Sequence, residues 1–363
     1  MPARPRTNTT ETCHEAHPAS RHRGVAAALA SAALFGVGTP MAKLLLAQAS
    51  PWLLAGLLYL GSGLGLWFWR LVTRAPAVAL QRSQAGWLAG AVLTGGVAGP
   101  VLLMTGLAGT SAAHASLLLN AEGVLTALIA WFAFKENFDR RIAVGMLAIV
   151  AGAVVLSWPA EVRVTALWPA LAVLAACLAW AVDNNLTRKV SGVDASFIAM
   201  TKGLVAGSTN LVLATAAGAL WPSAAVLAAG ALLGLLSYGC SLVLFVVALR
   251  ELGTARTGAY FSVAPFFGAL VAVGWLGDPL TPALVLAAAL MALGVALHLT
   301  ERHSHRHMHE PLAHSHPHEH DEHHRHVHAD GAPMAGSHTN WHRHEPTEHA
   351  HAHYPDLHHR HPH

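Results

Sequence analysis

The sequence predicts an all-α integral membrane protein: ten transmembrane helices arranged as two inverted five-helix repeats, with a disordered N-terminal tail and a disordered, histidine-rich C-terminal tail. The first observation is composition. The mean hydropathy is +0.43, and the charged fraction of 11% is less than half of the roughly 25% usual for soluble domains. The second is a series of long apolar stretches, and the third is the recurrence of one such stretch later in the chain. Together they favour two copies of one membrane unit.

Ten apolar stretches fill the middle of the chain, and most are close to the roughly 20 residues that a helix needs to cross a bilayer. They are expected to be helices, because only helices and closed barrels satisfy their backbone polar groups in lipid. We expect them at 24–47, 51–73, 85–107, 111–134, 141–158, 166–186, 195–218, 224–248, 256–277 and 280–299. Many of the charges lie in the tails, so the net charge of +3 gives no reason to expect a nucleic-acid partner.

One stretch is written twice. The segment TSAAHASLLLNAEGVLTALIAWFAFKE at 110–136 corresponds, 142 positions later, to LGTARTGAYFSVAPFFGALVAVGWLGD at 252–278. Without a gap, Ala127 falls on Ala269, and the same offset aligns other hydrophobic segments on either side. The chain therefore divides into a disordered tail at 1–23, a first repeat at 24–158, a second repeat at 159–300 and a disordered tail at 301–363.

Basic residues between the spans predict the orientation. With the N-terminus in the cytoplasm, the opposite side carries little beyond Arg163, with Lys43 near an outer helix end. The cytoplasmic loops then hold Arg70, Arg74, Arg82, Lys135, Arg140, Arg141, Arg188, Lys189, Arg250 and Arg256. This asymmetry follows the positive-inside rule and places both termini in the cytoplasm of a bacterial-type inner membrane. A unit with an odd number of spans makes the second copy inverted, which is the architecture of many secondary transporters.

Three segments carry a resemblance to a known family. They are LFGVGTPMAK at 34–43, LNAEGVLTALIAWFAFKE at 119–136 and VAPFFGALVAVGWLGD at 263–278. With the paired unit, they resemble the EamA-type carriers of the drug/metabolite transporter superfamily. The resemblance implies ten helices in two five-helix repeats and a carrier without ATP or a redox cofactor. Relatives move amino acids, sugars, nucleotide-linked compounds, purines and drugs, usually by export or exchange.

The family pattern has a proline near the end of each repeat and an acidic residue about thirteen positions later. The second copy has Pro265 and Asp278, where glutamate is the usual acid, and the first has Gly123 in the proline position with Glu136 intact. Helix capping alone would explain both acidic residues. The sequence also shows no GxxxxGK[ST] phosphate-binding loop. We therefore expect that the protein is not an enzyme and requires no cofactor.

Glu122 is the first candidate for the substrate pathway. It lies about eleven residues into its expected helix, near the middle of the membrane, with Asn120 and His114 close by in the sequence. An ionisable residue at the centre of a membrane helix costs at least about 2.5–3.5 kcal/mol and is read as functional by default. A carboxyl group at this depth suits proton-coupled exchange. The alternative is a hydrogen-bonded carboxyl group that ties helices together.

Asp183 and Lys202 form a second candidate group on consecutive spans. Their depths from the cytoplasmic end are about 8 and 12 Å by helix rise, which predicts a salt bridge between them. Asn184, Asn185 and Asn210 lie nearby and could hydrogen-bond a polar solute. The pair could contact substrate, act as a gate, or serve structure alone.

The C-terminal tail differs in composition from the rest of the chain, with 22 of the 27 histidines at 303–363. Neutral imidazole is a good ligand for Ni, Co, Zn and Cu, so we expect a loose, multi-site chelator. The tail could buffer or sense metal, present metal to a pore, or have no selected role. The candidate ligands are His303, His305, His307, His309, His314, His316, His318, His320, His323, His324, His326 and His328.

The sequence favours a transporter that exports or exchanges a small polar metabolite or drug. Two alternatives stay open: a divalent transition-metal exporter whose tail collects metal, and a membrane metal sensor that transports nothing. A homodimer is also open. Against the metal exporter, His114 is the only histidine well inside the expected spans.

Overall fold

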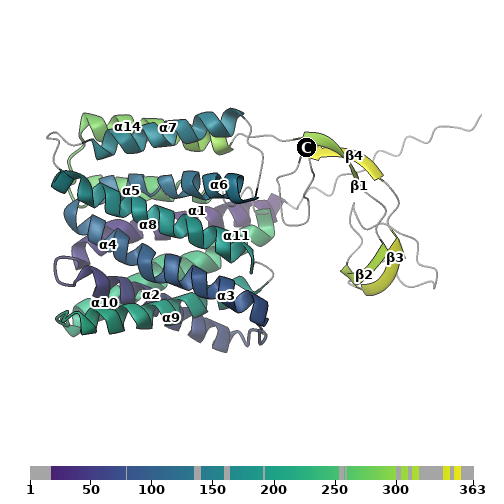
Figure 1. Ribbon diagram of the computed structural model, residues 1–363, viewed down its shortest axis with the longest axis horizontal. Coiled ribbons are helices and arrows are strands. Elements are labelled where there is room, and N and C mark those ends of the chain that lie inside the picture. Colours follow the sequence, from purple (N-terminus) through teal and green to yellow (C-terminus); the bar gives the residue numbers. More distant parts are fainter. Residues whose placement is uncertain are drawn as a thin grey trace, which may run out of the picture. The chain divides into compact units, whose positions relative to one another are not determined.

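The computed structural model describes residues 18–78, 80–134, 140–158, 164–190, 193–252, 257, 260–299, 304–309, 313–318, 338–343 and 347–352. The chain divides into two compact units, Met1–Thr300 and Glu301–His363. The first unit is built of helices, and the strands described lie in the second (Figure 1).

The helices of the first unit follow the expected apolar stretches. Their bounds are α1 Pro18–Leu45, α2 Pro51–Val72, α3 Arg82–Ala91, η1 Val92–Ala98, α4 Gly99–Gly109, α5 Ala112–Leu118, α6 Ala121–Phe134, α7 Arg140–Ser157, α8 Val164–Arg188, α9 Ala195–Ala216, α10 Ala224–Gly234, η2 Leu235–Cys240, α11 Ser241–Leu252, α13 Ala264–Gly274 and α14 Pro282–Leu299. The two segments labelled η are π-helical. Consecutive segments α3–η1–α4 and α10–η2–α11 each occupy one expected span.

Seven helical stretches in the described part of the chain are long and apolar enough to cross a membrane, with α3–η1–α4, α5–α6 and α10–η2–α11 each taken as one: His22–Leu45, Pro51–Val72, Arg82–Gly109, Ala112–Ile129, Leu167–Thr187, Ala195–Ala216 and Ala224–Ala248. Three shorter apolar helices, Ala143–Ser157, Ala264–Gly274 and Pro282–Leu297, lie where the fifth, ninth and tenth spans are expected. These helices support the prediction of an integral membrane protein. That the chain crosses the membrane ten times stays a prediction.

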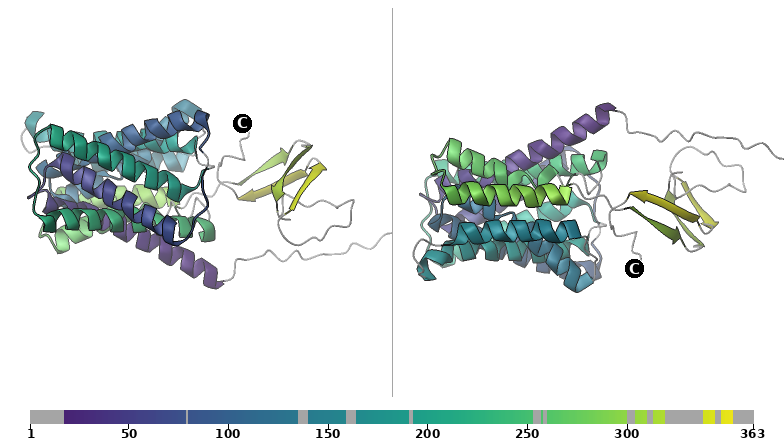
Figure 2. Two further views of the ribbon diagram at one scale, coloured as in Figure 1. Left: turned by 90° about the horizontal axis from the view of Figure 1, so that it is seen from below. Right: turned by 90° about the horizontal axis from the view of Figure 1, so that it is seen from above.

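The helix contacts of one half of the unit are repeated by the corresponding helices of the other half. By the offset of 142 positions, α1 corresponds to α8, α2 to α9 and α7 to α14. Helix α2 packs against α9, and α7 packs against α14, side by side in Figures 1 and 2. Helix α1 packs against α11 and α13 of the second half, while α8 packs against α4 and α6 of the first. Each half therefore completes the packing of the other.

Glycines allow the close approach of α2 and α9. A Cβ atom on Gly63 would overlap the backbone of Gly203 and Leu204, and a Cβ atom on Gly203 would overlap the backbone of Gly63. Small residues bring helix backbones together in lipid, where no hydrophobic force drives helices to associate.

The helix backbone is interrupted at matching places in the two halves. The π-helical segments Val92–Ala98 and Leu235–Cys240 begin 143 and end 142 positions apart. The expected helix at 111–134 is also broken, because turn residues at Leu119 and Asn120 separate α5 from α6. The expected span is present, since Ala112–Ile129 is long and apolar enough to cross a membrane, but it contains this turn. Interruptions of this kind occur often at functional sites.

Helix α1 begins at Pro18, so the boundary of the expected disordered tail at residue 23 is placed too late. Proline is well tolerated in the first turn of a helix, because the N–H that it lacks would have no partner there. Residues 1–17 of that tail lie outside the described residues.

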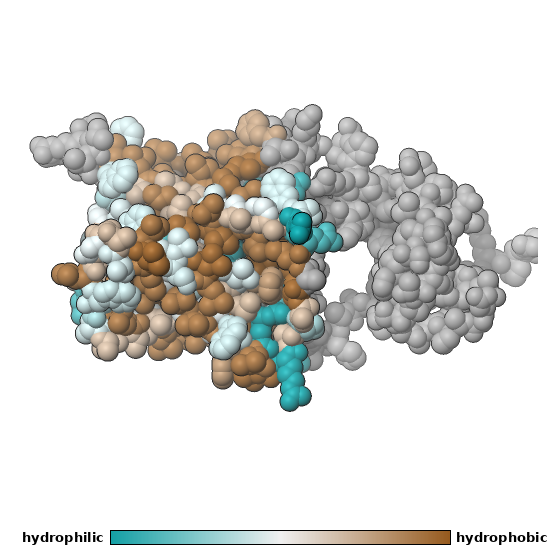
Figure 3. All heavy atoms as spheres, turned by 60° about the horizontal axis from the view of Figure 1, so that its bottom comes forward, coloured by the Kyte–Doolittle hydropathy of each residue, from teal (hydrophilic) through white to brown (hydrophobic). Residues whose placement is uncertain are grey.

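Apolar side chains cover most of the face of the helical unit seen in Figure 3, and hydrophilic residues gather toward one end. Large exposed residues include Phe132 at 75%, Trp158 at 74% and Trp275 at 73% of their full exposure. A soluble monomer rarely exposes apolar surface on this scale, whereas lipid covers it in a membrane.

The described part of the C-terminal unit contains four short strands. Strand β1 (Ser304–His309) pairs antiparallel with β4 (Thr347–Ala352), and β2 (Ala313–His318) pairs antiparallel with β3 (His338–Arg343). Composition predicts disorder for the tail, whereas these four segments are described as strands. Histidine alternates here with other residues, which matches the two-residue period of a strand.

Candidate functional site

A cavity of about 350 Å³ lies in the helical unit between the two halves of the chain. Its walls come from α1 and α2 of the first half and from α8, α9, η2 and α11 of the second. One wall reaches Ala195, the first residue of α9, so the cavity extends to the end of the bundle where α8 finishes and α9 starts. The volume is within the range of small-molecule sites, about 300–1,000 Å³.

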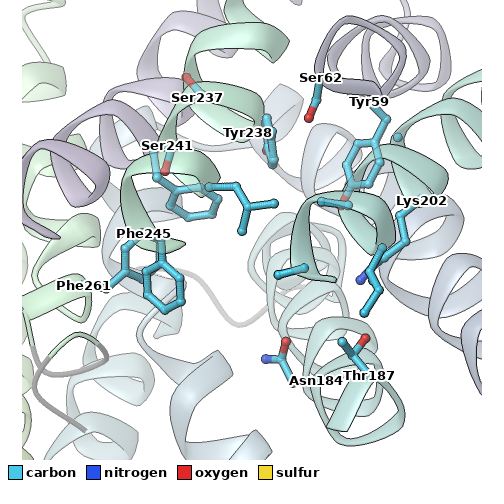
Figure 4. A pocket seen from close by; sticks show the side chains of 16 residues that line it. Tyr59, Ser62, Asn184, Thr187, Lys202, Ser237, Tyr238, Ser241, Phe245 and Phe261 are labelled. Atoms are coloured by element: carbon cyan, nitrogen blue, oxygen red, sulfur yellow. The ribbon is translucent and has the colours of Figure 1, made fainter. Parts of the chain in front are cut away.

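Five aromatic rings form a continuous chain along this cavity. The ring centroids of Phe245 and Phe261 lie 5.1 Å apart, those of Phe261 and Phe35 5.4 Å, those of Phe35 and Tyr238 5.6 Å, and those of Tyr238 and Tyr59 5.5 Å. All five line the cavity. Figure 4 shows Phe245 and Phe261 on one side, facing Tyr59 and Lys202 on the other.

Lys202 and Asp183 form the ion pair that the sequence predicts. The Lys202 Nζ atom donates to both carboxylate oxygens of Asp183, at 2.7 and 2.5 Å, and the Thr187 hydroxyl donates to Asp183 Oδ1 at 2.9 Å. The side chains retain 17% and 6% of their full exposure. Both Lys202 and Thr187 line the cavity, whereas Asp183 lies behind them, so the pair forms part of its polar wall.

The π-helical segment η1 holds this wall in place through Gly95. Its carbonyl oxygen accepts hydrogen bonds from Tyr59 Oη at 2.7 Å and from Trp180 Nε1 at 2.8 Å. A Cβ atom on Gly95 would overlap the carboxylate of Asp183. Glycine is therefore required at this point for α8 and η1 to approach with the buried carboxylate between them.

Glu122 is hydrogen-bonded to the side-chain amide of Asn184 in α8. Asn184 Nδ2 donates to Glu122 Oε1 at 2.9 Å and to Thr126 Oγ1 at 3.3 Å, and Asn184 itself lines the cavity. Asn185, one residue later, donates to the backbone carbonyls of Thr126 and Ala181 at 3.2 and 2.8 Å. Glu122 is half-buried and Asn184 is exposed, so the carboxyl group adjoins the cavity through Asn184.

Three predicted site residues lie outside this group. Asn210 is fully buried and donates to the carbonyl of Gly96 at 3.2 Å. Asn120 sits at the break between α5 and α6 and donates to Leu117 O at 2.9 Å. His114 lies in the first turn of α5, its Nδ1 atom 2.7 Å from the hydroxyl of Ser111. These contacts give Asn120 and His114 roles at helix ends.

A second ion pair lies near the start of α9. Arg70 Nη1 is 2.6 Å from Asp194 Oδ1, and it also donates to the Ser196 hydroxyl at 2.6 Å. Burial raises the pKa of the Asp194 carboxyl, but hydrogen bonds from Ser196 and the Phe197 N–H and the charge of Arg70 outweigh it, so this pKa lies below its usual range. The pair joins the end of α2 to the start of α9.

The structure gives a contact for one of the two acidic residues, Glu136 and Asp278, that lie thirteen positions after the family's proline position. Asp278 Oδ2 accepts a hydrogen bond from the backbone N–H of Ala113 at 2.8 Å, which caps α5 from the other half of the chain. Lys43 Nζ donates to the carbonyls of Leu107 and Ala108 at 2.6 and 3.1 Å, at the end of α4. Glu136 lies outside the described residues.

The aromatic wall was not identified from the sequence. Tyrosine is scarce in this chain, at four residues, and two of them, Tyr59 and Tyr238, lie in the middle of expected spans. That placement was the available signal, because tyrosine in a membrane helix is commoner near the interface. The phenylalanines gave none, since phenylalanine is an ordinary lipid-facing residue.

Of the predicted metal ligands, half lie in described strands: His305, His307, His309, His314, His316 and His318. The other six, His303, His320, His323, His324, His326 and His328, lie outside the described residues. Across the ladder of β1 and β4, His305 pairs with His351 and His307 with His349. Among all the residues that the structure describes, these strands included, no cluster of three or more His, Cys, Asp or Glu could hold a metal ion.

Comparison with known proteins points in one direction. The chain matches the EamA-like transporter family over residues 22–158 and again over 167–300. It is 28% identical over 263 residues to an uncharacterized transporter of Methanothermobacter thermautotrophicus, covering 68% of this chain and 77% of the relative. It is 40% identical over 109 residues to the probable 4-amino-4-deoxy-L-arabinose-phosphoundecaprenol flippase subunit ArnE of Pseudomonas paraeruginosa, covering 29% of this chain and 92% of that protein.

One solved structure, a crystal structure of a protein, aligns with a TM-score of 0.55 and 20% sequence identity. The alignment covers 77% of this chain and 95% of that chain. At this identity the likeness shows the fold alone.

Proposed function

Because the chain belongs to the EamA-like transporter family and so is a multi-pass membrane transporter of small solutes, we propose that it is a secondary transporter that exports or exchanges a small polar metabolite or drug. The membrane is a bacterial-type inner membrane, with both chain termini in the cytoplasm. The two halves act as inverted repeats that rock against each other around a site at their interface.

The cavity between the halves is the observation that carries this proposal. It is built from both halves, is about 350 Å³ in volume, and combines five aromatic rings with a polar wall. Movement of one half against the other would open and close such a cavity, because its walls belong to different halves. The exchange of helix contacts between the halves supports two states of similar packing.

Two polar groups have distinct roles in the proposal. Glu122, hydrogen-bonded to Asn184, takes up and releases the proton that is exchanged for the solute. The Asp183–Lys202 pair forms a gate at the polar wall, since a solute entering between α8 and α9 must pass it. Asn184 connects the two by lining the cavity and bonding Glu122.

Transport can be tested in vesicles reconstituted with the full chain and loaded with a cell extract. Solutes whose efflux depends on the protein and on a pH gradient are then identified by untargeted mass spectrometry. Amines belong in the search, because one relative is named for an amino-sugar lipid. Glu122→Gln should abolish the dependence on the pH gradient, while Glu161→Gln, between two of the expected spans, should leave it intact. Identical solute efflux from protein-free vesicles would contradict the proposal.

The histidine-rich tail raises a second candidate function, export of a divalent transition metal collected by the tail. The observation in its favour is the placement of 22 of the 27 histidines at 303–363. Our first proposal is that the tail binds Ni, Co, Zn or Cu loosely and that this metal is not transported. The transported solute is then a different compound. A membrane metal sensor that transports nothing is the third candidate.

Cells that express three versions of the protein separate these candidates: the full chain, a truncation after Thr300, and Glu122→Gln. Nickel, cobalt and zinc tolerance and cellular metal content are measured. If the full chain lowers metal content and Glu122→Gln abolishes that effect, metal is the cargo and the first proposal fails. If metal content is independent of Glu122, metal is not the cargo.

A further inference from the structure

The aromatic rings of the cavity are the starting point for naming its solute. Phe35 and Tyr59 come from the first half and Tyr238, Phe245 and Phe261 from the second, so the chain of rings crosses the interface. Aromatic ring faces carry negative electrostatic potential and attract cations, most strongly where water is excluded. The rings also offer apolar surface to an apolar group.

The charges around the cavity favour the same kind of solute. Lys202 and Asp183 neutralise each other, since the ammonium donates to both carboxylate oxygens. The Glu122 carboxyl has a neutral partner in the amide of Asn184. The described residues that line or adjoin the cavity therefore carry two carboxyl groups, Asp183 and Glu122, and one ammonium group, Lys202. When Glu122 is ionised, a solute with one positive charge balances the site.

An anionic solute fits less well. Its natural partner would be Lys202, but that ammonium already donates to both oxygens of Asp183, and Asp183 would be left buried with no cation. Breaking a buried pair by removing one partner is strongly unfavourable. A neutral, highly polar solute could bond hydroxyl groups of the lining, such as that of Ser62, but three of the five rings are phenylalanines, which offer it no hydrogen bond.

We infer that the transported solute is a monovalent organic cation with an apolar or aromatic body, which binds against the five rings with its charge toward Glu122. This inference rests on the proposed function and names the substrate class of the same site. It requires that Glu122 be ionised when the solute is bound.

Benzyltrimethylammonium is a suitable probe, because its charge is fixed at every pH and its body is aromatic. Benzyl alcohol and benzoate serve as neutral and anionic counterparts of similar size. Binding to the full chain in lipid nanodiscs is measured by isothermal titration calorimetry. Uptake of the same three compounds into vesicles that contain the protein is measured in parallel.

Three changes test the site. Phe261→Leu removes a ring and should weaken binding of the cation about 5- to 30-fold, and Phe261→Tyr keeps the ring and should stay close to wild type. Glu122→Gln should weaken the cation about tenfold or more while leaving benzyl alcohol unchanged. Phe132→Leu, on the outer face of α6, is the matched control and should have no effect. If Phe261→Leu does not fold, Phe245→Leu takes its place.

The inference is overturned if benzoate or benzyl alcohol binds as tightly as benzyltrimethylammonium, or if the ring variants behave like Phe132→Leu. Failure of the proposed function would look different. In that case the cation would bind with the expected dependence on Phe261 and Glu122 but would not enter vesicles. Uptake of another solute class without binding of the cation would sink the inference and leave transport standing.

Discussion

The ammonium group of Lys202 lies 2.7 and 2.5 Å from the two carboxylate oxygens of Asp183, which fastens α9 to α8 beside the cavity. Neither side chain is well exposed, at 17% and 6%. A charge so placed depends on its partner, because the surroundings offer little water to replace it.

Replacing Asp183 by Asn should therefore lower stability. We expect a loss of about 3–5 kcal/mol in the free energy of unfolding, since the Lys202 ammonium is left without its counter-charge. The double change Asp183→Leu with Lys202→Met should recover most of that loss. Fluorescence-detected thermal unfolding in detergent provides the measurement, and a wild-type melting temperature for Asp183→Asn would contradict the expectation.

The transport rate of these variants tests whether the Asp183–Lys202 pair is a gate or only stabilises the fold. If the pair is a gate, the stable double variant should bind solute and fail to transport it at the normal rate. If the double variant transports normally, or if Asp183→Asn lowers only the protein yield, the pair serves structure alone.

Gly95 should tolerate no side chain. Gly95→Ala would place a methyl group within the Asp183 carboxylate, so either η1 or α8 must move. We expect a loss of about 1–3 kcal/mol in stability and reduced transport. Gly86→Ala is the matched control in α3, where a Cβ atom would meet no atom from outside its own stretch of helix within 4 Å. It should be neutral or stabilising, because alanine is the better helix former. Equal melting temperatures for the two variants would rule out the close packing.

Asp194 should contribute stability in a pH-dependent way. Its carboxylate accepts the N–H of Phe197 at the start of α9 and pairs with Arg70. Asp194→Ala should cost about 1–2 kcal/mol, since cap and ion pair are both lost. Asp194→Asn, which can still accept the capping hydrogen bond, should cost less than about 1 kcal/mol.

The direction of the pH effect follows from the lowered pKa of Asp194. A carboxyl group whose pKa falls on folding contributes stability above its ordinary pKa of about 4, and loses it as the pH falls through the folded value. Wild type and Asp194→Asn should thus differ in melting temperature at about pH 7 and converge below about pH 4. A difference that persists in acid would mean that the charge is not responsible.

Hydropathy was sufficient to place the helices, because a bilayer requires long apolar stretches wherever the chain crosses. The ion pair between Asp183 and Lys202 was also predictable, since both depths follow from helix rise. The interruptions of the helix backbone could not be predicted from the sequence. The segments at 92–98 and 235–240 are apolar and glycine-containing like their neighbours, and a change from α- to π-helical bonding leaves hydropathy unaltered.

The break at Leu119 and Asn120 separates residues that the sequence places close together in one helix. In a continuous helix, His114 and Glu122 would be two turns apart and on neighbouring faces. In the structure His114 bonds Ser111 at the start of α5, while Glu122, beyond the turn, accepts a hydrogen bond from Asn184. Nor could the sequence show that Phe35, Tyr59, Tyr238, Phe245 and Phe261 converge, because they come from helices that meet only in the folded protein.

Removing the tail should separate metal binding from transport. The helical unit, Met1–Thr300, is compact by itself, and its cavity uses no residue beyond 300. A truncation after Thr300 should therefore keep the melting temperature and the solute transport of the full chain. It should lose most binding of Ni and Zn, since 22 of the 27 histidines are removed. Isothermal titration with each metal and vesicle transport, on the full chain and the truncation, measure both effects. Transport that falls in the truncation with metal absent would show that the tail acts on the helical unit itself.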